Sequence, residues 1–441
     1  MLDRVVEIAK KKLTRYEYEI FFLKNRKLKS ESQDLRVDKI IASEDVGFSV
    51  RVIKGKKQGF SYSTVFDTKS IEETIERAKD LCDVVSGEET VVLKDRLQKA
   101  EEIEYYDLFA TKLPVEEKIG KSIELERLVK QTDDRIKAVR NSTFIENIFE
   151  KHLINSFGLE VREIGTVYTA MVSAVAKEGE DSQIAWSYNS KRFLSDLDLE
   201  EIAKEAVFNS TSLLGAGSIK TKSMLVLFPP SSIVELLDTF SPAFLGDNLI
   251  KGKTLFKDKV EQKVASEKIT LIDNGVLSKG LASSSYDGDG VIKRKTVVVE
   301  NGYFTGFLHN LSTAKKANSQ STGNSSRSDF RTFPSVSITN FYIERSDDDI
   351  QKIIQDKDEV FYVIDMMGLH TADPISGDFS LGVNGLIISR GEIVRGVRGA
   401  IIAGNFLELL QKTVAVGRDL KFYANIGSPS VLVEGITIAG D

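Results

Sequence analysis

Apolar residues recur at two different spacings along this chain, one typical of strands and the other of helices. The order of these segments limits the possible folds more than any other feature of the sequence. Over residues 46–52, apolar side chains occupy every second position, which is typical of a strand with one face on a core. A Gly55–Gly59 turn follows and predicts a hairpin. Over residues 69–84, apolar side chains recur at helical spacing instead and predict a helix with one buried stripe.

The same two patterns continue through the rest of the chain. The central part predicts a helix over residues 113–131, strands near 135–149, 153–161, 166–176 and 182–188, and a helix that Asp198 caps. In the last part, Ser232 with Glu235 predicts the capped start of another helix, which Pro242 should end, among several short strands.

Hairpins mixed with isolated helices favour an α+β fold over a doubly wound parallel sheet. We therefore expect mixed and antiparallel sheets with packed helices, in which an N-terminal α/β unit precedes a larger, β-rich C-terminal unit. Shifts in pattern predict three domains, at residues 1–112, 113–221 and 222–441.

Charge and cysteine content exclude several classes of protein. The net charge of −6 argues against direct nucleic-acid binding, because neutralising phosphates requires a dominant basic surface. A single cysteine, Cys82, cannot form an intrachain disulfide, which suits a reducing cytoplasm. The apolar run Met224–Phe228 is too short to cross a membrane. We expect a cytoplasmic protein with no membrane association.

The residues give little sign of a catalytic centre. A catalytic zinc site usually needs three His, Cys or carboxylate ligands, and the three histidines are widely separated. His370 is the best candidate, because Asp365, Asp373 and Asp378 lie near it in sequence. One interpretation is a metal or acid–base cluster. The other is a polar loop whose aspartates cap turns.

Nucleophilic and phosphate-binding motifs are also lacking. Cys82 lies on the apolar stripe of its predicted helix and is interpreted as a small core residue. No G-x-S-x-G or G-x-x-x-x-G-K-[ST] pattern occurs. The Asp287–Gly290 segment begins like a calcium loop but lacks the later ligands, so it predicts a turn.

Several segments of the last part resemble the PmbA/TldD family in order and spacing. These segments are Glu300–His309, Ser321–Asn324, Ile375–Ser380 with Asn384-Gly385, Ile402–Asn405, Val416–Asp419, Gly427–Ser430 and Glu434–Gly440, together with Asn155–Gly158 in the central part. The resemblance covers residues 280–441 best, and the N-terminal third fits only in length and pattern.

The resemblance implies membership of the metal-free branch of this family. In the metal-bearing branch, an H-E-x-x-x-H helix and a late cysteine hold the ion of a peptidase. Here the comparable stretch, Glu235–Phe244, has no histidine and contains Pro242, and no cysteine occurs in Val416–Ile426. This branch, called PmbA or TldE, implies a non-catalytic subunit that pairs with a metal-bearing TldD-like subunit and acts on unfolded or leader peptides.

Cofactor and partner expectations follow from that assignment. We expect no metal in this chain, a metal in the partner, and either a mixed dimer or self-association. The glycine-rich loops have two interpretations: their backbone contacts a peptide closely, or their glycines only form turns. The candidate residues are His370, Asp373, Ser376, Gly377, Asp378, Gly404, Asn405, Gly323 and Asn324.

Two alternatives remain open at this stage. The chain could be a self-standing peptidase that uses His370 with carboxylates. It could instead be a homodimeric binding protein linked to modulation of DNA gyrase, a role described for the family.

Overall fold

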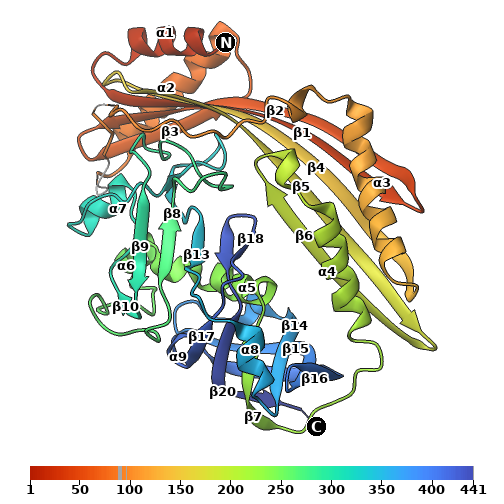
Figure 1. Cartoon of the computed structure of the whole chain (residues 1–441). Helices are drawn as coiled ribbons and strands as arrows, with labels where there is room; N and C mark the ends of the chain where they lie inside the picture. The colour runs from red at the N-terminus through yellow and green to blue at the C-terminus, as the bar shows by residue number, and fades with distance from the viewer. Residues whose placement is uncertain (88–91, 96, 441) are drawn as a thin grey trace.

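The computed structural model describes residues 1–87, 92–95 and 97–440. A long, curved, six-stranded sheet arches over a C-terminal unit that contains two smaller six-stranded sheets (Figure 1). Helices pack on each part. The predicted α+β class, with antiparallel and mixed sheets, is confirmed.

The long sheet is antiparallel throughout, in the order β3-β2-β1-β4-β5-β6. Its strands are β1 (Glu17–Gln33), β2 (Arg36–Lys54), β3 (Lys57–Ser63), β4 (Ile136–Asn155), β5 (Glu160–Glu178) and β6 (Asp181–Lys191). Because β1 pairs with β4, one hydrogen-bonded sheet spans both sides of the domain boundary predicted near residue 112. The division into three domains stays a prediction.

The predicted break between residues 149 and 153 is wrong, because β4 runs through it without interruption. The polar residues there stay in the strand by pairing with one another and with β5. Glu150 accepts hydrogen bonds from Arg162 at 2.9 Å and contacts the His152 ring at 2.8 Å. Cross-strand charge pairs of this kind stabilise a strand that its hydrophobicity alone would not predict.

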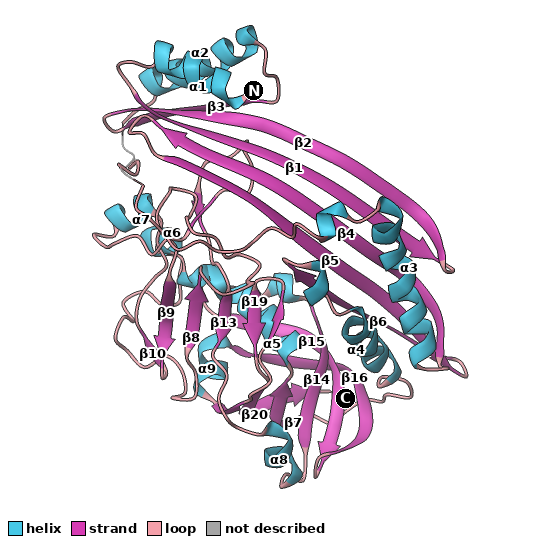
Figure 2. Cartoon of the chain, turned by 45° about the horizontal axis from the view of Figure 1, so that its top comes forward, coloured by secondary structure: helices cyan, strands magenta, loops and turns pink. Residues whose placement is uncertain are grey.

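Four helices cover the long sheet, and Figure 2 shows them in two groups. They are α1 (Leu2–Lys12), α2 (Thr68–Val84), α3 (Val115–Thr132) and α4 (Leu199–Thr211). The first pair packs on Ile20 and Phe48 at one end of the sheet, and the second pair packs on Phe144 and Tyr168 at the other. Cys82 is fully buried in the first core, and burial raises the pKa of its thiol, as expected of a core residue.

The C-terminal unit contains a second and a third sheet. The second has the order β10-β9-β8-β13-β19-β18, with β8 (Leu271–Asn274), β9 (Lys295–Glu300), β10 (Tyr303–Phe304), β13 (Phe341–Ile343), β18 (Lys421–Tyr423) and β19 (Ile426–Ser428). The third has the order β16-β15-β14-β7-β20-β17, with β7 (Lys222–Phe228), β14 (Val360–Met367), β15 (Asp378–Ser389), β16 (Glu392–Asn405), β17 (Thr413–Val416) and β20 (Val431–Ala439). Since β16 also pairs with β20, five strands of the third sheet close into a small barrel.

Short elements complete this unit. They are the helices α5 (Pro230–Phe240), α6 (Gly246–Ile250), α7 (Leu311–Lys316), α8 (Ile350–Gln355) and α9 (Phe406–Gln411), the 3₁₀ turns η3 (Ser241–Phe244) and η4 (Leu369–Thr371), and the pair β11 (Ser325–Ser326) and β12 (Ser335–Val336). Two further 3₁₀ turns, η1 (Ala110–Lys112) and η2 (Leu194–Asp196), lie beside the long sheet. Helix α5 belongs to the largest core, where Phe240 stacks on Phe406 with ring centroids 4.4 Å apart.

A buried junction joins the long sheet to the C-terminal unit. The Phe330 ring lies against Gly47 of β2, where a Cβ atom would approach it to 2.3 Å. Glu19 of β1 is buried and forms ion pairs with Arg51 and with Arg327 of the C-terminal unit. These contacts fix the position of the long sheet above the cavities described below.

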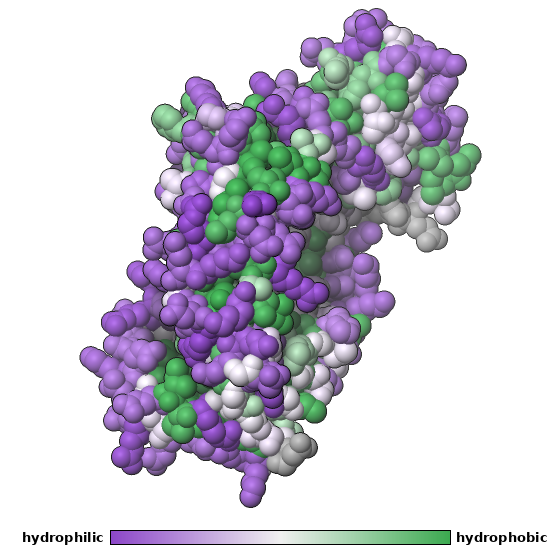
Figure 3. All heavy atoms as spheres, turned by 90° about the vertical axis from the view of Figure 1, so that its right-hand side faces the viewer, coloured by the Kyte–Doolittle hydropathy of each residue, from purple (hydrophilic) through white to green (hydrophobic). Residues whose placement is uncertain are grey.

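Figure 3 shows the side on which the far ends of the long strands lie, and hydrophobic residues form separate patches there in a largely hydrophilic surface. Within the described ranges, no helix combines the length and the apolar character needed to cross a bilayer.

Candidate functional site beside helix α5

A cavity of about 570 Å³ lies between the long sheet and helix α5. Strand β6 and helix α4 line one side of it, and α5 with strands β14, β15 and β18 lines the other. The polar or aromatic side chains that line it are Gln183, Trp186, Ser187, Tyr188, Glu205, Asn209, Ser231, Ser232, Glu235, Asp238, Asp365, Asn384 and Tyr423. This cavity combines apolar walls with a limited number of polar groups, a mixture that is typical of binding sites.

Helix α5 presents two carboxylates to the cavity because of its residue spacing. Ile233, Leu236 and Leu237 are buried in the core of the C-terminal unit. Glu235 and Asp238 are separated by three residues, so they lie one turn apart on the remaining face. The helix thus has a core face and a cavity face.

The predicted cap of this helix is wrong. Pro230 is its first residue and Pro229 its N-cap, so the helix starts two residues before the predicted Ser232 cap. Proline is favoured at the first helical position because its fixed φ suits the first turn. It also lacks an N–H group, and an N–H at this position would have no acceptor within the helix. The Ser232 hydroxyl instead donates to the Val363 carbonyl at 3.4 Å.

An aromatic wall faces the carboxylates. Trp186 and Tyr188, two residues apart on β6, stack with ring centroids 5.4 Å apart, and Tyr188 lies 6.0 Å from the Tyr423 ring. Trp186 and Ile184 are about half exposed, at 47% and 50%. Such rings can bury apolar groups and attract cations.

Glu205 holds the two sides of the cavity together. From helix α4, its carboxylate accepts hydrogen bonds from the Ser187 hydroxyl at 2.9 Å, the Tyr423 hydroxyl at 2.5 Å and the Lys421 ammonium at 3.1 Å. Burial, together with the neighbouring Glu205 carboxylate, raises the pKa of Tyr423, so that hydroxyl stays a donor. We interpret Glu205 as a structural link.

The other carboxyl groups of the cavity are shifted towards their neutral forms. Burial, with a smaller contribution from the Asp365 charge, raises the pKa of Glu235 to about 7. Burial also raises the pKa of Asp365 and of Asp238, although hydrogen bonds from Met366 and Asn384 oppose the shift at Asp365. Near neutral pH, Glu235 is therefore available both as a hydrogen-bond donor and as an acceptor.

These residues do not fit a peptidase zinc ion. Zinc in catalytic sites is held mainly by imidazole and thiolate, supported by one carboxylate, and α5 carries neither histidine nor cysteine. Throughout the described part of the chain, no three His, Cys, Asp or Glu side chains lie close enough to hold a metal ion together. The cavity can instead bind amide, hydroxyl or cationic groups.

Seven of the nine sequence-predicted residues come together in a loop next to α9. Asn405, the N-cap of α9, donates to the Ser376 carbonyl at 3.0 Å and to Asp378 at 2.8 Å. Gly377 has a φ of +87°, and a Cβ atom there would lie 3.0 Å from the Asn405 amide nitrogen. Gly404 pairs with the neighbouring strand β15 opposite Phe379.

His370 and Asp373 lie at the start of the same loop. His370 is exposed in η4, and Asp373 accepts the Ile375 N–H at 2.8 Å, as an aspartate that caps a turn does. Asp365, which the sequence places near His370, lines the cavity instead. The role of this loop in peptide contact stays a prediction.

Gly323 and Asn324 lie elsewhere, in the loop that precedes β11. Asn324 is buried and donates to the Asp273 carboxylate at 2.7 Å and to the Ser337 carbonyl at 3.0 Å. Gly323 has a φ of +80° against the backbone of Ile292. These contacts join two loops of the C-terminal unit, and neither residue lines the α5 cavity.

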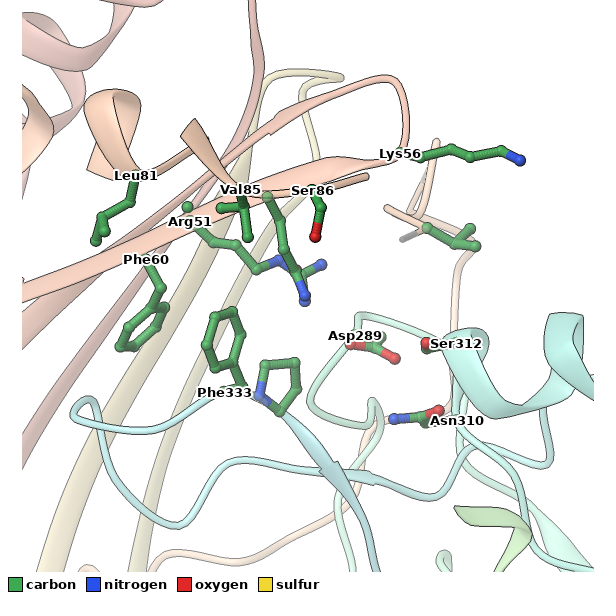
Figure 4. Close-up of a pocket in the computed structure, with 14 residues that line it drawn as sticks. Arg51, Lys56, Phe60, Leu81, Val85, Ser86, Asp289, Asn310, Ser312 and Phe333 are labelled. Carbon is green, nitrogen blue, oxygen red and sulfur yellow. The ribbon is translucent and has the colours of Figure 1, made fainter. Parts of the chain in front are cut away.

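A second cavity, of about 720 Å³, lies at the junction of the two parts (Figure 4). Arg51 points into it from β2, and the rings of Phe60 and Phe333 pack side by side on its wall with ring centroids 4.5 Å apart. Asp289 and Asn310 line its opposite wall. Because Arg51 already pairs with Glu19, we assign this arginine to the junction.

The sequence did not single out the aromatic wall or Glu205, because their pattern is that of an ordinary strand and helix. One signal was available in α5. Two carboxylates spaced by three residues, on a helix with an apolar stripe of Ile233, Leu236, Leu237 and Phe240, indicate a polar face that is turned towards something other than bulk solvent.

The fold and the site together define a protein of the PmbA/TldD metallopeptidase class. Sequence models of the family match almost the whole chain: PmbA/TldA metallopeptidase domain 1 matches residues 18–82, the central domain matches 110–214 and the C-terminal domain matches 221–440. The chain belongs to this family.

Relatives match more than nine tenths of its length. An uncharacterised protein of Methanocaldococcus jannaschii is 29% identical over 98% of this chain and 99% of its own. Metalloprotease PmbA of Escherichia coli O157:H7 is 25% identical over 92% of this chain and 88% of its own.

Two solved structures have the same fold. TldE from Thermococcus kodakarensis superposes with a TM-score of 0.90, at 26% identity and with 100% of both chains covered. A proposed modulator of a DNA gyrase from Thermotoga maritima also gives 0.90, at 28% identity and with 99% of both chains covered.

Proposed function

We propose that this chain is the non-catalytic subunit of a peptide-cleaving complex, and that the α5 cavity contacts the peptide. The observation that carries the proposal is the cavity face of α5, which has Glu235 and Asp238 where a metallopeptidase helix would present imidazoles. Without a bound ion, this site has no means to lower the pKa of a water molecule or to polarise a peptide carbonyl.

The likeness to a TldE structure supports this role. The catalytic metal would then belong to a TldD-like partner with an H-E-x-x-x-H helix. The contribution of this chain would be binding: the half-exposed Trp186 offers an apolar surface, and the carboxyl groups offer hydrogen bonds to the backbone or to basic side chains of an unfolded peptide.

Reconstitution with purified proteins tests this role. The chain, a metal-bearing relative from the same genome, and an equimolar mixture are each incubated with an unfolded protein such as reduced, alkylated α-lactalbumin. We expect cleavage by the mixture, little from either protein alone, and complete inhibition by a chelator. Stoichiometric zinc in this chain on its own, together with chelator-sensitive cleavage, would overturn the proposal.

Substitutions in the cavity then test whether this chain contacts the peptide. Trp186→Ala should raise the KM of the mixture severalfold with little change in kcat, because it removes binding surface without touching the metal site. Ile393→Ala, an exposed apolar residue on β16, is the matched control. Equal kinetics for the two variants would remove the α5 cavity from the binding site.

Substitution of His370 distinguishes our proposal from the alternative of a self-standing peptidase. If that alternative holds, the pure chain cleaves peptides and His370→Ala abolishes the cleavage. If our proposal holds, His370→Ala leaves the activity of the mixture within about twofold of the unsubstituted chain.

A further inference from the structure

A small cavity of about 90 Å³ lies where one face of the long sheet meets the C-terminal unit. Strands β1, β4 and β5 line one side of it, and segments around Tyr286, Lys293 and Ser325 line the other. It shares no lining residue with the α5 cavity or with the cavity that Arg51 lines. It is therefore a separate place in the fold.

Strand pairing places two opposite charges side by side in this cavity. Lys151 of β4 lies directly opposite Glu163 of β5, and both residues line the cavity. Residues in such positions usually form a cross-strand ion pair. Here neither side chain has an ion pair with any residue that the structure describes, and the Lys151 ammonium lies 4.7 Å from the centre of the Phe149 ring. Both charges thus remain available to a ligand.

Lys293 brings a second ammonium group from the C-terminal unit. It donates to the Ala282 carbonyl at 2.9 Å and has no ion pair within the described residues. Burial lowers the pKa of Lys293; the Glu163 charge opposes that shift and the Lys151 charge adds to it. The three charged groups therefore act on one another across the cavity. An ammonium group has three hydrogens to donate, so Lys293 still needs acceptors.

Ser325 adds a polar group that has no partner. This residue is only 4% exposed, it lines the cavity, and its hydroxyl oxygen makes no hydrogen bond. Burying a hydroxyl without a hydrogen bond is unfavourable. This hydroxyl is independent of the charged groups and points, as they do, to a ligand.

The remaining charges of the cavity are already satisfied. The Asp287 carboxylate accepts three backbone N–H groups, each at 2.9 Å. Arg327 forms its ion pair with Glu19. The groups left for a ligand are thus two ammonium groups, one hydroxyl and one carboxylate, together with an apolar wall.

We propose that this cavity binds a small zwitterion, namely a free α-amino acid with a side chain about the size of a methyl group. Lys151, Lys293 and the Ser325 hydroxyl bind its carboxylate, and Glu163 binds its ammonium group. Hydrogen bonds between ionised groups are stronger than those between neutral groups. Leu153 and Val161, the apolar pair next to Lys151 and Glu163, lie beside the ligand side chain.

The size of the cavity limits the ligand. Its volume has room for about six water molecules, which is comparable to the number of non-hydrogen atoms in alanine. A large aromatic amino acid does not fit. The proposal concerns a ligand at the junction of the two parts of the chain and does not depend on the function proposed above.

A larger cavity of about 740 Å³ adjoins the small one and favours a zwitterion over a simple anion. The two share Val161, Glu163, Ser284 and Tyr286, so the larger cavity offers a way in. Glutamates outnumber basic residues in its lining, which contains Glu101, Glu102, Glu160 and Glu163 against Lys99 and Arg162. Negative potential at an entrance disfavours an approaching anion but has little effect on a molecule without net charge.

Equilibrium dialysis of the purified chain tests the proposal. We expect one molecule of labelled L-alanine per chain, with a Kd below about 1 mM, which so few atoms can provide. Propionate, which lacks the ammonium group, and ethylamine, which lacks the carboxylate, should each bind at least about tenfold more weakly. L-Tryptophan should not compete. Absence of saturable alanine binding, or equal binding of propionate or inorganic phosphate, would overturn the proposal.

Glu163→Gln tests the part assigned to the carboxylate. The variant keeps the size of the side chain and removes its charge, so alanine should bind at least about tenfold more weakly while propionate binding is unchanged. Glu178→Gln, at an exposed position near the other end of the same strand, is the matched control and should bind alanine as the wild type does. Wild-type affinity of Glu163→Gln for alanine would refute this assignment.

Ser325→Ala separates ligand binding from a structural role. Because its hydroxyl has no partner in the protein, the substitution should leave the thermal stability of the ligand-free chain unchanged or raised. The affinity for alanine should fall severalfold. A lower melting temperature with unchanged alanine affinity would show that the hydroxyl serves the fold, and would contradict the proposal.

Discussion

At the scale of single residues, Glu235 shows how position changes chemistry. The same glutamate on an exposed helix would be ionised at neutral pH. Here burial and the neighbouring Asp365 raise its pKa from 4.5 to about 7. The folded protein therefore binds a proton at Glu235 more tightly than the unfolded chain does, and this difference links stability to pH.

The direction in which stability changes with pH predicts how Glu235→Gln alters the free energy of unfolding. The wild-type glutamate is protonated in both states below pH 4.5, and stability falls as pH rises from there to about 7, where the folded state also loses the proton. Glutamine has no such loss. The variant should therefore be more stable than wild type at pH 8, by about 3 kcal/mol, with little difference at pH 4.

Guanidinium unfolding at both pH values measures this difference. Glu434→Gln, at an exposed position on β20, serves as the control. Equal effects of the two substitutions at pH 8 would mean that Glu235 is not desolvated as the structure indicates.

At the scale of elements, close backbone approach decides where helix α2 lies on strand β3. A Cβ atom on Gly59 would lie 1.8 Å from the Ala78 carbonyl oxygen and 2.4 Å from the Cys82 nitrogen. Only glycine permits this contact. By contrast, a Cβ atom on Gly120, in the middle of α3, would meet nothing within 4 Å.

Substitution by alanine should have opposite effects on the free energy of unfolding at these two glycines. Gly59→Ala forces α2 away from the sheet and should lower the free energy of unfolding by about 3 kcal/mol. Gly120→Ala removes flexibility of the unfolded chain and should raise it by about 0.5–1 kcal/mol. Thermal unfolding of both variants measures this contrast, and a neutral Gly59→Ala would contradict the packing of α2 on β3.

At the scale of the whole molecule, the buried junction sets the distance between the long sheet and the C-terminal unit. Glu19 and Arg327 are each only 3% exposed in their side chains, so their charges are largely removed from water. The Arg327 guanidinium also lies 5.2 Å from the centre of the Phe21 ring. Buried ion pairs contribute little net stability, but removing one partner is costly.

Arg327→Met should therefore destabilise the protein by about 3–5 kcal/mol, because it leaves Glu19 with only the more distant Arg51. Adding Glu19→Gln to this variant should recover part of that loss, since it removes a buried carboxylate that has lost its nearer guanidinium partner. Chemical denaturation measures both effects. A double variant that is less stable than Arg327→Met would mean that the glutamate charge has other essential partners.

Local structure was largely determined by the sequence. The predicted helix over residues 69–84 is α2 at 68–84, and Asp198 caps α4 by accepting the Glu201 N–H at 2.9 Å. These features depend on side chains within one or two turns of each other, so periodicity and capping chemistry suffice to predict them. The resemblance to the PmbA/TldD family was also visible in the sequence and is confirmed.

The tertiary structure alone decided the long sheet and the cavity. Pairing between β1 and β4 joins segments more than one hundred residues apart, and the cavity brings together Trp186, Glu205, Glu235 and Asp365 from four elements. The sequence around each of these residues is that of an ordinary strand or helix. Their burial, their altered pKa values and their common cavity arise only from long-range packing, which sequence periodicity does not encode.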